Sequence, residues 1–121
     1  MKTIYGVLAI FLFSFCNSAN AQYVTIPDSA FRSQLILKFP GCFNSVGQMD
    51  TSCVSILNNT VLKICVLCDN TALDATNIKN LEGLKYFKNL SEVYIWDNLL
   101  LTRLPKLPSS LKYITLQNAK I

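Results

Sequence analysis

Apolar residues recur every fourth position in the segment after residue 27, as they do on one face of a helix. The recurring residues are Phe31, Leu35 and Phe39. Just before them, Asp28 or Ser29 can accept the free amide hydrogens of a first helical turn, and Pro40-Gly41 ends the pattern. The pattern predicts one short amphipathic helix, which must pack its apolar stripe on another element.

A different periodicity governs the segment SEVYIWDN, residues 91–98. Its residue types alternate as in a half-buried strand, where successive side chains point to opposite faces. Val93 and Ile95 form one set and are expected to face a core. Tyr94 and Trp96 form the other set, so the only tryptophan of the chain is expected to point outward beside a tyrosine.

The strand pattern returns along the chain, which indicates internal repeats. Residues 90–100 align with residues 111–121 at a shift of 21, and all four apolar positions match in type. A weaker copy lies 22 residues earlier, over 68–78. Between the copies, apolar residues occur at every third position: Leu81, Leu84, Phe87 and Leu90, then Leu101, Leu104 and Leu107.

These motifs resemble the leucine-rich-repeat family, whose pattern is L-x-x-L-x-L-x-x-N-x-L with a spacing of roughly 20 to 29 residues. Segment 78–90 resembles the internalin-like class, and segment 101–111 (LTRLPKLPSSL) resembles the short bacterial class. The stretches IPDSAF (26–31), FPGCFN (39–44) and MDTSC (49–53) are similar to the N-terminal cap of secreted bacterial members.

The resemblance implies an α/β solenoid. Residues 61–121 would form a short leucine-rich-repeat array of about two and a half repeats, with parallel strands and an irregular or 3-10 convex side. Residues 22–60 would form an N-terminal helical, disulfide-linked cap. The pattern's asparagine position holds Thr76, Asn98 and Ala119 in the three copies, and no end cap follows the third copy. A truncated remnant of a longer repeat protein, without independent function, is therefore the alternative.

The first 21 residues have the order of a secretory signal peptide: a basic residue, an apolar run and small residues at a cleavage point. These are Lys2, the run 4–15 and Ala19-Asn20-Ala21. The run is too short to span a membrane. We therefore expect a secreted or cell-surface protein with no membrane insertion after cleavage.

Secretion favours disulfides over free thiols, and four cysteines would remain after cleavage. Four cysteines allow three pairings. Cys42 and Cys53 enclose a short loop rich in turn-forming residues, which favours a bridge between them, with a helical turn near 53–57. Cys65 and Cys68 would then either pair with each other or remain small buried apolar groups. A redox or zinc site at this C-x-x-C is the less favoured interpretation.

The composition contains few of the residues that common catalytic sites use. The chain of 121 residues has no histidine, 11 basic and 7 acidic residues, and a formal net charge of +4. The absence of histidine excludes Ser-His-Asp and Cys-His nucleophiles and all histidine metal sites. The basic residues are scattered, unlike a nucleic-acid footprint. We expect no catalytic residue, metal or cofactor, and no nucleic-acid partner.

What remains is a binding surface for a protein or carbohydrate ligand. Strand alternation sends one set of residues to the concave sheet face that the resemblance implies: Glu92, Tyr94, Trp96, Tyr113, Thr115 and Gln117, with Asn70, Ala72 and Asp74 in the weaker copy. Parallel stacking would place Tyr94 beside Thr115 and Trp96 beside Gln117. Exposed Trp and Tyr side chains are typical of recognition sites. The alternative is that these aromatic rings only cover the backbone of the neighbouring strands. We also expect self-association through an uncapped C-terminal strand edge.

Overall fold

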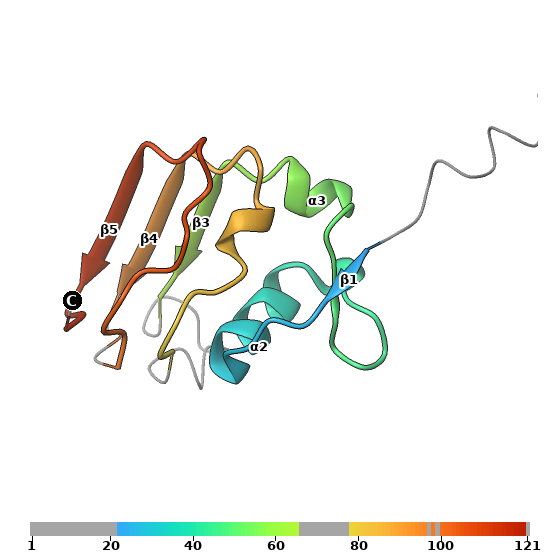
Figure 1. Ribbon diagram of the computed structural model, residues 1–121, viewed down its shortest axis with the longest axis horizontal. Coiled ribbons are helices and arrows are strands. Elements are labelled where there is room, and N and C mark those ends of the chain that lie inside the picture. Colours follow the sequence, from blue (N-terminus) through green and yellow to red (C-terminus); the bar gives the residue numbers. More distant parts are fainter. Residues whose placement is uncertain (1–21, 66–77, 97, 99, 121) are drawn as a thin grey trace, which may run out of the picture.

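The computed structural model describes residues 22–65, 78–96, 98 and 100–120. These residues form two small sheets, two α-helices and two 3-10 turns, drawn in Figure 1. In chain order the elements are β1 (Tyr23–Val24), α2 (Ser29–Lys38), η1 (Pro40–Cys42), β2 (Met49–Asp50), α3 (Val54–Leu57), β3 (Val61–Ile64), η3 (Leu84–Tyr86), β4 (Glu92–Trp96) and β5 (Tyr113–Gln117).

Helix α2 forms where the fourfold apolar spacing predicts it. Asp28 is its N-cap, and the Asp28 carboxylate accepts a hydrogen bond of 2.9 Å from the backbone N–H of Phe31. Phe31 and Leu35 are fully buried, and Phe39 is partly buried against the same core. The helix therefore begins at a side-chain cap and is held in place by its apolar stripe.

The larger sheet is parallel and has the order β3-β4-β5. Val61 pairs with Glu92, and Glu92 pairs in turn with Tyr113. All three strands point the same way in Figure 1, where β3 lies on the side of α2 and β5 is farthest from it. Strands β3 and β4 alternate in burial, so Leu62, Val93 and the residues two positions later face the core.

Backbone hydrogen bonds set this register at the strand starts. The carbonyl of Thr60 accepts the backbone N–H groups of Ser91 and Glu92 at 2.9 and 3.1 Å, and the Ser91 hydroxyl at 3.0 Å. The carbonyl of Ser91 accepts the N–H groups of Lys112 and Tyr113 in the same way. Because the same contact recurs at both strand pairs, the outward positions of neighbouring strands stay aligned.

One hydrophobic core joins the N-terminal and C-terminal parts of the described chain. It contains Phe31 and Leu35 of α2, Ile64 of β3 and Ile95 of β4, all at most 1% exposed. The residues at every third position between the strands also belong to it: Leu81, Leu84, Phe87 and Leu90. Their burial explains why apolar residues occur at every third position in this segment.

The solenoid predicted from the repeat pattern is wrong. Among the described residues, the structure is a small α/β fold with an antiparallel pair, β1–β2, and one sheet of three parallel strands. Val61 and Glu92 are 31 positions apart, whereas Glu92 and Tyr113 are 21 apart, so no constant unit repeats. The apolar periodicity arises because the segments return to one shared core, which alternation alone cannot distinguish from stacked repeats.

The predicted helical, disulfide-linked cap is wrong as well. The bridge Cys42–Cys53 is present. It joins the end of turn η1 to the residue that precedes the one-turn helix α3, and the short strand β2 lies between them. Cys42 is packed in the same core as the parallel sheet. The bridge therefore closes a loop beside the common core, and the segment is no separate cap.

Several predictions fall outside the described residues. The signal peptide (1–21) is one, and the weaker repeat copy with Asn70, Ala72 and Asp74 is another. The pairing of Cys65 with Cys68 stays a prediction, since Cys68 is also outside them. The domain boundaries at residues 21 and 60 stay predictions too. Within the described part, no helix is long and apolar enough to cross a membrane.

Candidate ligand-binding face

The residues predicted to bind a ligand lie side by side on the face of the parallel sheet that points away from the core. We call this surface the outward face; it consists of Glu92, Tyr94, Trp96, Tyr113, Thr115, Gln117 and Lys63. The register pairs Tyr94 with Thr115 and Trp96 with Gln117, as the sequence predicts. The three residues on β4 are half-buried and the three on β5 are exposed.

Two aromatic rings form the centre of the outward face. The rings of Tyr94 and Trp96 are stacked, with centroids 5.7 Å apart and planes 16° from parallel. They come from positions i and i+2 of one strand, so both stand on the same side of the sheet. Such stacking fixes the two rings relative to each other, and both side chains remain half-buried.

The hydroxyl of Tyr94 is hydrogen-bonded to a carboxylate. The Tyr94 hydroxyl donates a hydrogen bond of 2.6 Å to Oε2 of Glu92. This bond, then desolvation and the negative charges that Glu92 and an ionised Tyr113 would carry, raise the pKa of Tyr94 above its ordinary value of 10.0. Tyr94 is therefore a neutral donor at physiological pH, and its bond orients the Glu92 side chain.

The sequence prediction missed Lys63. Its ammonium nitrogen lies 5.7 Å from the centroid of the Tyr94 ring, within the range of a cation–π contact. The register places Lys63 directly beside Tyr94. The available signal was the alternation of Val61-Leu62-Lys63-Ile64, in which Leu62 and Ile64 are buried.

The outer strand β5 adds an exposed third aromatic residue. Tyr113 is 65% exposed and is paired with Glu92. Within the described residues β5 hydrogen-bonds to β4 alone, and Ile114 and Leu116 on its inner side are only partly buried. Self-association through this edge stays a prediction.

Asn98 follows β4 and occupies the asparagine position of the repeat pattern. Its backbone carbonyl accepts the N–H of Leu101 at 3.3 Å. Its side chain is fully buried, and among the described residues neither the amide oxygen nor the amide nitrogen has a hydrogen-bond partner. Asn98 is therefore not part of the exposed surface.

The outward face presents several kinds of side chain. It combines aromatic edges, hydroxyls, an amide and one charge of each sign, and Glu92 is its one carboxylate. In the described part of the chain, no three His, Cys, Asp or Glu residues gather into a group able to hold a metal.

Comparison of the chain with protein-family models, curated proteins and solved structures gave no match. The resemblance to leucine-rich-repeat proteins thus rests on the sequence motifs alone. The function must be inferred from the geometry of the chain's own residues.

Proposed function

We propose that this chain is a secreted, non-enzymatic binding protein that contacts a protein ligand through its outward face. The observation that carries the proposal is the stacked pair Tyr94–Trp96, which the Glu92 hydrogen bond and the Lys63 ammonium hold in position. Pre-positioned Trp and Tyr side chains contribute strongly to protein interfaces because little conformational entropy is lost when they are covered.

The ring geometry favours a protein ligand over a glycan. Sugars commonly stack on a free aromatic face, but one face of the Tyr94 ring lies against Trp96, and the Lys63 ammonium also approaches that ring. The edges, the indole N–H and the neighbouring polar groups of Thr115 and Gln117 offer hydrogen bonds instead. A peptide backbone presents complementary donors and acceptors.

Secretion is part of the proposal. Its support is the signal-like order of residues 1–21 together with the disulfide Cys42–Cys53, which is compatible with an extracellular protein. Expression of the full chain with and without residues 1–21, followed by measurement of the exported fraction, tests it. Equal export of both forms would refute the assignment.

The binding proposal is tested with peptides selected from a random displayed library on the purified chain. Trp96 is the only tryptophan, so a peptide on the outward face should change the intrinsic fluorescence. The variant Tyr94→Ala/Trp96→Ala should lose at least about tenfold in affinity for these peptides, measured by calorimetry. Tyr23→Ala, at an exposed tyrosine of β1, is the control and should bind normally.

Circular dichroism and urea unfolding decide whether the double variant is folded. Full binding by a folded double variant would overturn the proposal. The proposal would also be overturned if sugars on a glycan array bound the chain through Tyr94 and Trp96 and the selected peptides did not. Loss of folding in the double variant would place the rings in a structural role, and Thr115→Lys, at an exposed position beside Tyr94, would then test the face separately.

A further inference from the structure

A second surface feature lies on the segments that connect the parallel strands. The turn η3 and the segment 106–109 form the walls of a groove of about 350 Å³. Its lining consists of Lys85, Tyr86, Lys88, Lys106, Leu107, Pro108 and Ser109. None of these residues belongs to the outward face, so a ligand in this groove would be independent of the proposed function.

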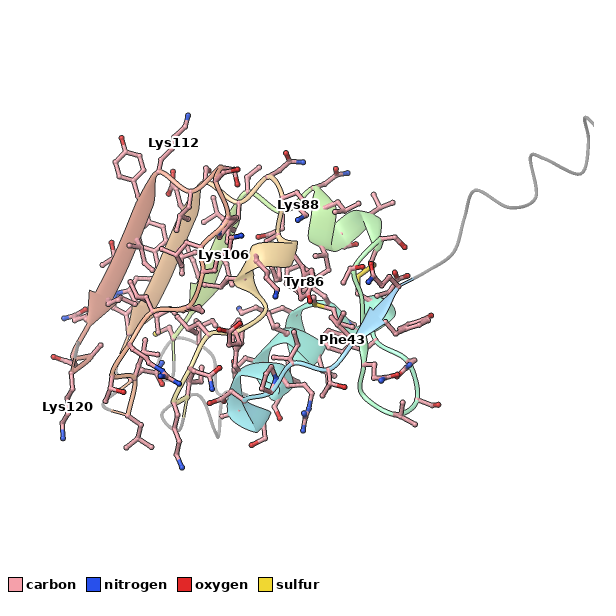
Figure 2. All side chains as sticks on the ribbon, in the orientation of Figure 1. Phe43, Tyr86, Lys88, Lys106, Lys112 and Lys120 are labelled. Carbon is pink, nitrogen blue, oxygen red and sulfur yellow. A yellow bond between two sulfur atoms is a disulfide. The ribbon has the colours of Figure 1, made fainter. Side chains whose placement is uncertain are left out.

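The groove is positively charged. Three of its lining side chains are lysines, all exposed, and no carboxylate of the described residues lines it. Figure 2 shows Tyr86, Lys88 and Lys106 grouped around η3, whereas Lys112 and Lys120 lie at the two ends of β5. Three like charges around one concavity repel one another, and a bound anion would relieve this repulsion.

The walls of the groove are fixed by the core beneath them. Leu84 and Phe87, on either side of Tyr86, are fully buried. On the other wall, Pro108 is buried, and its carbonyl accepts the N–H of Leu111 at 3.1 Å. The lysine stems therefore start from positions that do not move independently of the fold.

The groove also offers neutral hydrogen-bond donors. Ser109 contributes an exposed hydroxyl and Tyr86 a half-buried phenol. The Tyr86 ring lies 5.2 Å from the ammonium nitrogen of Lys85, a cation–π contact that holds both side chains at the rim. Ammonium groups and hydroxyls together are a donor set for tetrahedral oxyanions.

The extent of the positive charge limits the size of the ligand. The adjoining hollow shares Lys106 and is lined by Arg103 but also by Glu82, whose carboxylate interrupts the positive surface. A nucleic acid requires a longer continuous basic track. A ligand with one or two oxyanion groups fits better.

We infer that this groove binds a sulfate or phosphate group, with Lys85, Lys88 and Lys106 supplying the charge and Ser109 a hydroxyl donor. The group would be an ester on a saccharide or on a lipid headgroup, or it would be a free anion. These sources share one chemistry and are distinguished by the probe.

The test uses the purified full chain and four probes: inorganic phosphate, inorganic sulfate, sucrose octasulfate, and phosphatidylglycerol in phosphatidylcholine vesicles. Calorimetry measures the soluble probes and co-sedimentation the vesicles. The variant Lys88→Ala/Lys106→Ala should weaken binding about tenfold, since each removed charge is expected to contribute roughly a factor of three. The matched control Lys112→Ala/Lys120→Ala removes the same net charge elsewhere and should change affinity less than about twofold.

Loss confined to the groove variant, with any of the four probes, supports the site and identifies the source of the anion. Equal losses in both variants would show attraction by net charge and overturn it. The proposed site would also be overturned if none of the probes bound. The same holds if a DNA duplex bound more tightly than the probes and its binding depended equally on all four lysines. All four substitutions are at exposed side chains, so urea unfolding is expected to show folded variants as stable as the unchanged protein.

Discussion

Oδ2 of Asp28 accepts a hydrogen bond of 2.8 Å from the backbone N–H of Lys79, which lies 51 positions further along the chain. The same atom accepts the N–H of Asn80 at 3.1 Å, while Oδ1 caps helix α2. One largely buried carboxylate thus ties the start of the helix to the segment that leads into η3.

Asp28→Ala should lower the free energy of unfolding by about 1–3 kcal/mol, because three backbone amides lose their acceptor. Asp28→Asn, which keeps one acceptor oxygen, should lose less. Urea unfolding followed by circular dichroism measures both. Glu82→Ala removes an exposed carboxylate and is the control; an equal loss there would assign the effect to charge alone.

Gly83→Ala should be strongly destabilising. Gly83 has a φ of +118°, and an added Cβ would lie 2.5 Å from Cδ1 of the fully buried Ile26. Backbone strain of this kind costs about 1–3 kcal/mol, and the clash adds to it. Thermal unfolding should show a clear fall in Tm.

Gly41→Ala is the matched comparison for that substitution. Its Cβ would meet nothing within 4 Å, and its φ is not in the left-handed region. Its Tm should stay close to that of the unchanged protein or rise slightly. Similar losses for both alanines would mean that Ile26 and the backbone adjust freely around residue 83.

Removing the bridge with Cys42→Ala/Cys53→Ala should cost about 3 kcal/mol of stability, the entropy of closing a loop with a sequence separation of 11. Cys42 is buried, so its alanine also loses some packing. Comparing the variant with the unchanged chain in reducing buffer separates the two effects. No change on reduction would show that the core alone fixes this loop.

The titration of Tyr94 should depend on Glu92. The folded protein holds the neutral phenol more tightly than the unfolded chain does, because Glu92 accepts its hydrogen bond. This contribution to stability is complete below the unfolded pKa and is lost as pH rises through the higher folded pKa. Glu92→Gln should lower the pKa of Tyr94 toward its ordinary value, measured by NMR of the tyrosine ring carbons.

Glu82→Gln is the control for this titration, since it removes the same charge from outside the outward face. It should leave the Tyr94 transition in place. A Tyr94 pKa that does not respond to Glu92→Gln would show that the Glu92 hydrogen bond is not the cause of the shift.

The sequence predicted the local elements better than their assembly. The spacing of Phe31, Leu35 and Phe39 located α2, and the alternation around Val93 and Ile95 located β4 with its outward Tyr94 and Trp96. The shift of 21 predicted the register of β4 with β5. These features depend on nearby residues, which a single sequence displays directly.

The wrong and missing predictions concern contacts between distant residues. The antiparallel pair β1–β2 has two residues in each strand, too few for a period to be visible. The repeat pattern placed the strand before β4 in the weaker copy, over 68–78. The strand that pairs with β4 is β3, 31 positions before it. The second role of Asp28, at Lys79, carries no local signal at all, because an N-cap residue looks the same with or without a distant partner.

The undivided core has a practical consequence for finding the ligand. Since α2 and the parallel sheet share buried side chains, the described fold is expected to melt as one cooperative unit. A compound that binds only the folded state then raises the melting temperature of the whole molecule, wherever it attaches. A thermal-shift screen needs no label and no prior choice between the two surfaces, and the variants at Trp96 and Lys106 would afterwards show which surface each hit occupies.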